Sequence, residues 1–260
     1  MKKVTPKKRL GQHFLTDENI AARIVDQLSI PAGVTNVLEI GPGMGVLTNY
    51  LIQQTRYQTT LIDIDAESVV YLRAHYPQLA DHILEADFLR LDLSKLFAGQ
   101  FSIIGNFPYN ISSQILFKVL EYRQQVVEVV CMLQKEVAER IAAGPGSKVY
   151  GILSVLLQAF YTVEYKFTVG REVFNPPPKV LSGVITLVRN EVDHLACSEK
   201  KFFEVVKRSF GTRRKTLRNC LRPYQLPETI TSQPVFDKRA EQLSVAEFIL
   251  LTQLVEENAS

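Results

Sequence analysis

Short apolar runs alternate with amphipathic stretches along most of the chain. Runs rich in Val, Ile and Leu, bounded by turn residues, predict buried strands. These strands are expected at 36–40, 59–64, 101–104 and 126–133, with one more ending at Ala86-Asp87. Stretches with helical spacing of apolar side chains are found at 17–28, 46–54, 66–76, 112–121 and 134–142. Strands that alternate with helices predict an α/β domain whose parallel sheet is covered on both faces.

The pattern changes after this alternation. Two strands are predicted at 162–169 and 180–188 without a helix between them, so we expect them to pair antiparallel. The segment from Phe174 to Lys179 contains three consecutive prolines and predicts a stiff extended loop. The α/β domain is therefore expected to end in an antiparallel hairpin near residue 190.

The remainder of the chain predicts a separate helical unit. Strand signals stop near residue 191, and the apolar spacing is helical at 199–220 and 244–257. Gly211, Pro223 and Pro227 are expected to interrupt these helices. We therefore expect a Rossmann-like α/β domain over residues 1–190 and a small all-α domain over residues 191–260.

The composition is that of an ordinary globular protein. Hydrophobic residues make up 46% and charged residues 22% of the 260 residues, which excludes a disordered chain, a collagen-like repeat and a coiled coil. No apolar run approaches the roughly 18–20 residues of a membrane-spanning helix. The three cysteines are too few and too scattered for a disulfide scaffold or a zinc site, so no metal is expected. The amino terminus lacks a secretory signal, and we expect a cytoplasmic protein.

The net charge of +3 conceals a strong segregation of charge. Residues 1–9 have a local charge of +5 and residues 201–222 one of +7, so the rest of the chain has a net charge of −9. Basic clusters bind polyanions, and the apolar residues interleaved at 201–222 favour a nucleic-acid surface there. A basic segment can also be a solvated tail, and this alternative stays open for both segments, more so for residues 1–9.

Residues suited to nucleoside binding follow four of the predicted strands. The glycine-rich run from Gly41 to Gly45 follows the first strand, and Asp63 comes 22 residues after Gly41, where a carboxylate can bind both ribose hydroxyls. Asp87 and Asn106 end two further strands. Because the carboxyl ends of parallel strands meet at one edge, we expect these residues to line one crevice. Each aspartate could instead cap a helix, and the glycine run alone could be a tight turn.

The tetrapeptide Asn106-Phe107-Pro108-Tyr109 suits a reaction at the amino group of a base. The lone pair of an adenine amino group is delocalised into the ring, which makes the nitrogen a poor nucleophile. Two hydrogen-bond acceptors that hold its N–H groups favour a tetrahedral nitrogen, and the Asn106 side chain and the Pro108 carbonyl can supply them. Tyr109 offers a ring on which the base can stack. A simple β-turn is the alternative.

Six motifs occur together in a fixed order, and their combination resembles one family. They are Gly11-Gln-His-Phe-Leu15, Glu39-Ile-Gly-Pro-Gly43, Glu85-Ala-Asp87, Gly105-Asn-Phe-Pro-Tyr-Asn-Ile-Ser112, Met132-Leu-Gln-Lys-Glu136 and Phe174-Asn-Pro-Pro-Pro-Lys-Val180. This series resembles the KsgA/RsmA family of S-adenosylmethionine-dependent rRNA adenine N6-dimethyltransferases. The resemblance extends over nearly the whole chain. It implies a class I methyltransferase sheet followed by a helical RNA-binding domain.

The resemblance implies a site for S-adenosylmethionine. Its residues would be His13, Leu15, Gly41, Gly43, Asp63, Asp87, Phe88 and Asn106. In this assignment Asp63 binds the ribose, Asp87 accepts from the adenine amino group of the cofactor, and Phe88 lies against the adenine ring. Three residues differ from the usual family pattern, namely His13 for Asn, Phe107 for Leu and Asp63 for Glu. The resemblance does not say what His13 changes.

The resemblance also implies the acceptor and its site. Asn106 and the Pro108 carbonyl would bind the target amino group, and Tyr109 and Phe174 would sandwich the flipped adenine. The substrate implied is a pair of adjacent adenines in the 3′-terminal hairpin of 16S rRNA in the small ribosomal subunit, modified by a monomeric enzyme during subunit biogenesis. Residues expected to bind RNA are Arg213, Arg214, Lys215 and Arg218.

Two other functions remain open at this point. A large-subunit rRNA methyltransferase would share the catalytic fold, although the run from Phe210 to Asn219 resembles the small-subunit family. A ribosome-assembly factor that binds through its basic helices, with methylation as a secondary activity, would also fit the charge pattern.

Overall fold

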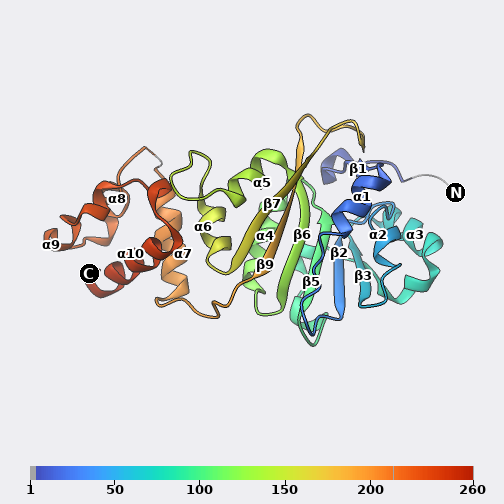
Figure 1. Ribbon diagram of the computed structural model, residues 1–260, viewed down its shortest axis with the longest axis horizontal. Coiled ribbons are helices and arrows are strands. Elements are labelled where there is room, and N and C mark those ends of the chain that lie inside the picture. Colours follow the sequence, from blue (N-terminus) through green and yellow to red (C-terminus); the bar gives the residue numbers. More distant parts are fainter. Residues whose placement is uncertain (1–3, 213, 260) are drawn as a thin grey trace. The chain divides into compact units, whose positions relative to one another are not determined.

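The computed structural model describes residues 4–212 and 214–259 (Figure 1). Within these ranges the main sheet consists of β2 (Asn36–Ile40), β3 (Gln58–Asp63), β4 (Ile83–Glu85), β5 (Phe101–Asn106), β6 (Val126–Gln134), β7 (Tyr161–Val169) and β9 (Ser182–Arg189). Their order across the sheet is β4-β3-β2-β5-β6-β9-β7. The pairs among β2 to β6 are parallel, and β9 runs antiparallel to β6. The predicted α/β class with a mostly parallel sheet is confirmed, and the two predicted late strands are neighbours in the sheet.

Most of the helices that connect these strands lie between residues 18 and 142. They are α1 (Glu18–Val25), α2 (Thr48–Leu51), α3 (Ala66–His75), α4 (Ser112–Glu121) and α5 (Lys135–Ala142). The prediction of a helix over 46–54 was wrong in extent, because α2 has four residues. In the flanking residues, bonds between residues four apart, such as Asn49 N to Gly45 O (3.0 Å), are mixed with bonds between residues three apart, such as Gln54 N to Leu51 O (3.1 Å).

Strand β6 forms the centre of the core. Its residues from Val126 to Leu133 are all buried, as expected for a strand with helices on both faces. Glu128 is the charged member of this run, and its carboxylate accepts hydrogen bonds from Ser29 N (2.6 Å), Ser29 Oγ (2.7 Å) and Ser102 Oγ (2.9 Å). These bonds compensate the buried charge and tie the segment after α1 to the sheet.

A second, two-stranded sheet joins the amino-terminal arm to the proline-rich segment. β1 (Phe14–Leu15) pairs antiparallel with β8 (Phe174–Asn175), and Leu15 lies opposite Phe174. Thr16 extends this contact, since its backbone N donates to Val173 O at 2.8 Å. The expectation of a loop over 174–179 therefore needs correction at its start, because the partner strand comes from a distant part of the sequence and leaves no local signal.

The contacts of the chain group it into two compact units. Unit 1 comprises residues 1–138 and 162–189, and unit 2 comprises residues 139–161 and 190–260. Unit 2 contains α6 (Ile152–Gln158), α7 (Glu199–Phe210), α8 (Leu217–Cys220), α9 (Glu228–Thr231) and α10 (Val245–Asn258). None of the helices in the described part of the chain is long and apolar enough to span a membrane.

This grouping differs from the expected division at residue 190 because of α6. The apolar α6 packs on α7 and α10, and the nearby Tyr150 ring lies edge-on to that of Phe210 at 6.2 Å. A helix that is apolar on all sides shows no helical period, so the sequence did not reveal α6. The assignment of methyltransfer to residues 1–190 and of RNA binding to residues 191–260 stays a prediction.

The remaining short helices are of the 3-10 type. They are Lys8–Leu10, Pro77–His82, Phe88–Arg90, Leu93–Lys95, Arg222–Tyr224, Pro234–Asp237 and Ala240–Gln242. Two of them belong to the site described next. The turn Lys8–Leu10 comes shortly before His13, and the turn Phe88–Arg90 starts with Phe88.

Candidate functional site

A cavity of about 200 Å³ opens at the carboxyl ends of β2, β3, β4 and β5. It is lined by Ile40, Gly41 and Gly43 after β2 and by residues 9–14, 62–64, 86–89 and 106–111. The predicted site residues around this cavity are His13, Gly41, Gly43, Asp63, Asp87, Phe88, Asn106, Pro108 and Tyr109. The structure thus brings together at one sheet edge residues that are up to ninety-six positions apart in the sequence, from His13 to Tyr109. Their individual roles stay predictions.

The glycine run after β2 is shaped for close approach. Gly41 and Gly43 have φ angles of 66° and 58°, which favour glycine. A Cβ on Gly43 would lie 2.7 Å from the ring of Phe14, so a larger residue would displace the arm that lines the cavity. A backbone without side chains at this edge lets a ligand approach the end of β2.

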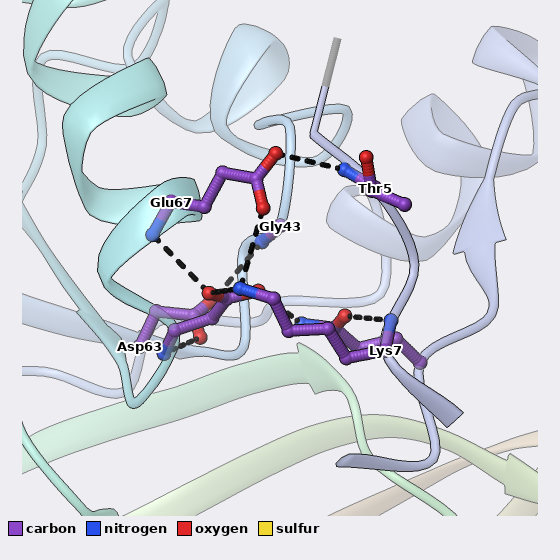
Figure 2. Close-up of polar contacts among 7 residues, drawn as sticks. Thr5, Lys7, Gly43, Asp63 and Glu67 are labelled. Carbon is purple, nitrogen blue, oxygen red and sulfur yellow. Dashed lines mark hydrogen bonds and ion pairs between the residues drawn. The ribbon is translucent and has the colours of Figure 1, made fainter. Parts of the chain in front are cut away.

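Asp63 ends β3 with both carboxylate oxygens held by the backbone (Figure 2). Oδ2 accepts a hydrogen bond from Gly43 N (3.2 Å) and Oδ1 accepts one from Asp65 N (2.9 Å). The side chain is 6% exposed, and burial raises the pKa of Asp63 to about 6. A carboxylate that is costly to ionise in a buried cavity is suited to a ligand with hydroxyl donors and a positive charge.

Glu39 is a buried acid that the sequence showed only as part of a motif. It lies in β2 and accepts a hydrogen bond from Thr48 Oγ1 at 2.7 Å, which connects the strand to α2. Burial raises the pKa of Glu39 to about 8, so this carboxyl group is protonated at neutral pH. The signal in the sequence was an acid inside an apolar strand next to a glycine. Glu39 is therefore a neutral partner of Thr48, two residues before the glycine run.

The Asp87–Phe88 pair follows β4 and starts a 3-10 turn. The Asp87 carboxylate accepts a hydrogen bond from Leu89 N at 2.9 Å, and the Phe88 ring is buried on the cavity wall. Lys118 of α4 supports this turn from the protein side. Its Nζ donates to Leu89 O (3.1 Å) and to Leu91 O, and it lies 5.4 Å from the centre of the Phe88 ring.

Lys118 was not among the predicted site residues. Its side chain is 8% exposed, and burial lowers the pKa of its ammonium group. A lysine on the apolar face of a predicted helix was the one available signal in the sequence. Its partners are backbone carbonyl groups twenty-seven and twenty-nine residues away, which no local pattern identifies.

The tetrapeptide Asn106–Tyr109 begins at the last residue of β5 and also lines the cavity. Asn106 Nδ2 donates to the backbone oxygen of His13 at 2.9 Å, which fixes the orientation of the amide. The Tyr109 hydroxyl and Ser182 Oγ lie 2.5 Å apart, and burial raises the pKa of Tyr109. The rings of His13 and Tyr109 stack at 5.5 Å, and His13 Nδ1 is 2.8 Å from Pro176 O.

The structure does not place Leu15 and Phe174 on this cavity. Both side chains are 4% exposed and belong to the hydrophobic core that also contains Ile24 and Met132. They face each other across β1 and β8, where the pleat directs alternate side chains to opposite faces. His13, one residue before β1, provides the ring that stacks on Tyr109 in this arrangement. A sandwich of adenine between Tyr109 and Phe174 would require the Phe174 ring to leave the core.

Comparison with known proteins identifies the family. The family model described as ribosomal RNA adenine dimethylase matches residues 4–257. The chain belongs to this family. It is 58% identical to the ribosomal RNA small subunit methyltransferase A of Cytophaga hutchinsonii, over 98% of this chain and 99% of that protein. The protein of the same name from Flavobacterium johnsoniae is 57% identical over 98% of each chain. The resemblance inferred from the six motifs is confirmed.

Solved structures agree with this family assignment. A dimethyladenosine transferase from Plasmodium falciparum superposes with a TM-score of 0.80 at 25% identity, covering 95% of this chain and 99% of that chain. The 23S rRNA methyltransferase ErmE superposes with a TM-score of 0.67 at 26% identity, covering 94% and 99%. The predicted Rossmann-like methyltransferase fold is therefore confirmed.

Unit 2 of this family member has a basic cleft of about 690 Å³. Its lining includes Lys207, Arg208, Lys215, Asn219 and Tyr224. The guanidinium group of Arg208 lies 5.2 Å from the centre of the Tyr224 ring. Basic side chains around an aromatic ring are what RNA-binding proteins use for phosphates and unstacked bases. The sequence had indicated the charges of this segment but not the ring.

The four residues predicted to bind RNA have different environments. Arg214 and Lys215 are exposed, and Lys215 lines the basic cleft. Arg218 forms an ion pair with Asp237, with Nη2 and Oδ1 2.6 Å apart. Arg213 lies outside the described residues. Of the three that are described, Arg214 and Lys215 are the better placed for phosphate.

Proposed function

We propose that the chain uses S-adenosylmethionine to dimethylate N6 of two adjacent adenines in the 3′-terminal hairpin of 16S rRNA, during biogenesis of the small ribosomal subunit. The observation that carries this proposal is the convergence of the Asp63 carboxylate and the Asn106–Tyr109 segment on one cavity. Support for the small-subunit target comes from curated relatives at 57–58% identity, which are named ribosomal RNA small subunit methyltransferase A.

The residues of the cavity fit S-adenosylmethionine. Asp63 can accept both ribose hydroxyls, Asp87 can accept from the adenine amino group, and Phe88 can lie against the ring. The glycine run leaves room beside β2 where a Cβ would collide with Phe14. When bound, the cofactor supplies an electrophilic methyl group on a sulfonium centre. The two aspartates give the cavity the negative charge that a cation requires.

On the acceptor side, the protein orients a weak nucleophile. The Asn106 amide, fixed by its bond to His13 O, offers its oxygen to one hydrogen of the adenine amino group, and the Pro108 carbonyl can accept the other. These two bonds direct the nitrogen lone pair toward the methyl group. Tyr109 can hold the flipped base by stacking. Positioning supplies most of the rate in this scheme, and the proton leaves to water after transfer.

The basic cleft of unit 2 is the proposed contact with the RNA backbone. Lys215 and Arg208 can neutralise phosphates, and the Tyr224 ring can take an unstacked base. Binding of this kind depends strongly on salt and little on sequence. The choice of the two adenines then falls to the shape of the hairpin and to the acceptor site of unit 1.

A large-subunit target is the rival, because ErmE shares the fold at a TM-score of 0.67. The deciding experiment treats ribosomal RNA from a strain that lacks this protein with purified protein and isotopically labelled S-adenosylmethionine. Mass spectrometry is expected to find the label as N6-dimethyladenine at two adjacent positions near the 3′ end of 16S rRNA. Label in 23S rRNA, or no label in 16S rRNA, would refute the proposed target.

A further inference from the structure

The amino-terminal arm is attached to the cofactor side of unit 1 by a polar network (Figure 2). Lys7 Nζ contacts Asp65 Oδ1 and lies 3.3 Å from Glu67 Oε2. Gln12 Nε2 donates to Asp65 Oδ2 at 3.0 Å, and Lys7 N donates to Gln12 Oε1 at 2.8 Å. Thr5 N adds a bond to Glu67 Oε1 at 3.1 Å. We call Lys7, Gln12, Asp65 and Glu67 the clasp.

The clasp connects two walls of the cavity. On one side, Gln12 belongs to residues 9–14, which line the cavity. On the other side, Asp65 N donates to Asp63 Oδ1 at 2.9 Å, so Asp65 helps to hold the carboxylate that would bind ribose. Asp65 also begins α3, because its Oδ1 accepts a hydrogen bond from Glu67 N at 3.1 Å. A shift of Asp65 would therefore move both Asp63 and the start of α3.

Lys7 and Gln12 stabilise the negative charge of Asp65. Although burial alone would raise the pKa of Asp65, hydrogen bonds from Lys7 and Gln12 hold this pKa below its ordinary value. Asp65 is therefore ionised, and a second negative charge so close to Asp63 opposes the ionisation of Asp63. Lys7 lies against Asp65 and offsets that charge. The ammonium group of Lys7 thus favours the ionised form of Asp65 and offsets the negative charge that Asp65 places beside Asp63.

We propose that Lys7 and Gln12 are positioning residues of the cofactor site, which hold residues 9–14 against the cavity and keep Asp63 aligned through Asp65. The proposal rests on the proposed function, since it takes S-adenosylmethionine as the ligand of the cavity. The proposal gives Lys7 a role in cofactor binding. From the sequence alone, Lys7 belonged to a basic arm that was expected to be either an RNA-binding segment or a solvated tail.

Lys8 provides a matched control. It is adjacent to Lys7, is exposed, and takes no part in the clasp. If the arm acts only through its charge on RNA, Lys7→Met and Lys8→Met will have equal effects. If the clasp acts as proposed, the two variants will differ in cofactor affinity and in the backbone hydrogen exchange of residues 9–14.

The test measures cofactor affinity by calorimetry for the wild type, Lys7→Met, Lys7→Arg and Lys8→Met, using S-adenosylmethionine. We expect Lys7→Met to weaken cofactor binding about fivefold, because it removes an ion pair near the surface. Lys7→Arg should restore most of the lost affinity. Lys8→Met should bind as the wild type does. Equal affinity of Lys7→Met and Lys8→Met would overturn the clasp. Failure of the wild type to bind would instead refute the proposed function, and the clasp with it.

A second measurement needs no cofactor. Hydrogen exchange of the backbone amides of residues 9–14 is expected to be faster in Lys7→Met than in the wild type and unchanged in Lys8→Met, while amides of α10 stay as protected as before. Unchanged exchange at 9–14 in Lys7→Met would overturn the proposal, even if cofactor affinity fell. Affinity for a 16S rRNA fragment, measured at several salt concentrations, should have the wild-type salt dependence in Lys7→Met.

Discussion

Basic side chains of two segments that look alike in the sequence have different surroundings in the structure. In the amino-terminal arm, Lys7 is paired with two acids of unit 1, Asp65 and Glu67. In unit 2, Arg214 and Lys215 are exposed, and Lys215 lines an open cleft. Local charge density therefore does not tell what a basic side chain binds. The acids that the fold brings close decide whether the charge is already compensated.

The comparison predicts that changes around the unit 1 cavity alter catalysis or cofactor binding, and that changes in the unit 2 cleft alter RNA binding. Each of the following variants tests whether the unit 1 cavity and the unit 2 cleft have these separate roles.

The largest effect is expected from Asn106→Ala. It removes the side-chain acceptor for the adenine amino group, so methyl transfer to undermethylated small subunits should fall by about 10²–10³-fold, comparable to the loss of one transition-state hydrogen bond. Affinity for the RNA should be nearly unchanged. Asn36→Ala serves as the control, because Asn36 is the first residue of β2 and the cavity lies at the other end of that strand. Turnover of Asn106→Ala near the wild-type rate would contradict the assigned role.

Asp63 predicts a pH dependence of cofactor binding. With its pKa raised to about 6 by burial, the carboxyl group is protonated below that pH and ionised above it. The ionised form accepts the ribose hydroxyls, so affinity should fall by at most about tenfold per pH unit below 6 and be constant above it. Near pH 6 Glu39 is protonated and Asp65 is ionised, so neither of them titrates with Asp63.

Calorimetry from pH 5 to 7.5 checks this expectation, with Asp63→Asn as the comparison. The variant should bind weakly at every pH and show no inflection near 6. A wild type whose affinity does not change across the range would exclude Asp63 as the titrating ligand group.

The double variant Arg214→Gln, Lys215→Gln tests the other region. Loss of two phosphate contacts should weaken binding of a 16S rRNA fragment about tenfold at moderate salt and reduce the salt slope by about 1–2. Cofactor affinity should be unchanged. Arg218→Gln is the matched control, because Arg218 is already paired with Asp237. A loss of cofactor affinity in the double variant would show that the two regions are not separate.

The smallest effect is expected from Lys118→Met. The variant keeps the length and apolar stem of the side chain but loses the bonds to Leu89 O and Leu91 O. The turn that carries Asp87 and Phe88 should loosen, and the KM for S-adenosylmethionine should rise about threefold with little change in kcat. Steady-state kinetics checks this. An unchanged KM with lower thermal stability would make Lys118 a purely structural residue.

Much of the fold and of the site could be predicted because the relevant signals are local. Apolar runs of strand length and helical spacing predicted the elements of the sheet, and the rule that parallel strands end at one edge predicted that Gly41, Asp63, Asp87 and Asn106 converge. The same local reading failed for α6, which is apolar on all sides, and it predicted too long a helix at α2.

The sequence by itself determined which chemical groups follow the predicted strands, and the rule that parallel strands end at one edge predicted that they meet there. Only the tertiary structure decided which partner each group has. Lys7 meets Asp65 across 58 positions of sequence, Leu15 and Phe174 are buried together in the core, and His13 stacks on Tyr109. The physical reason is that hydrogen bonds, ion pairs and burial depend on distances in space, and contacts between remote segments leave no period in the sequence.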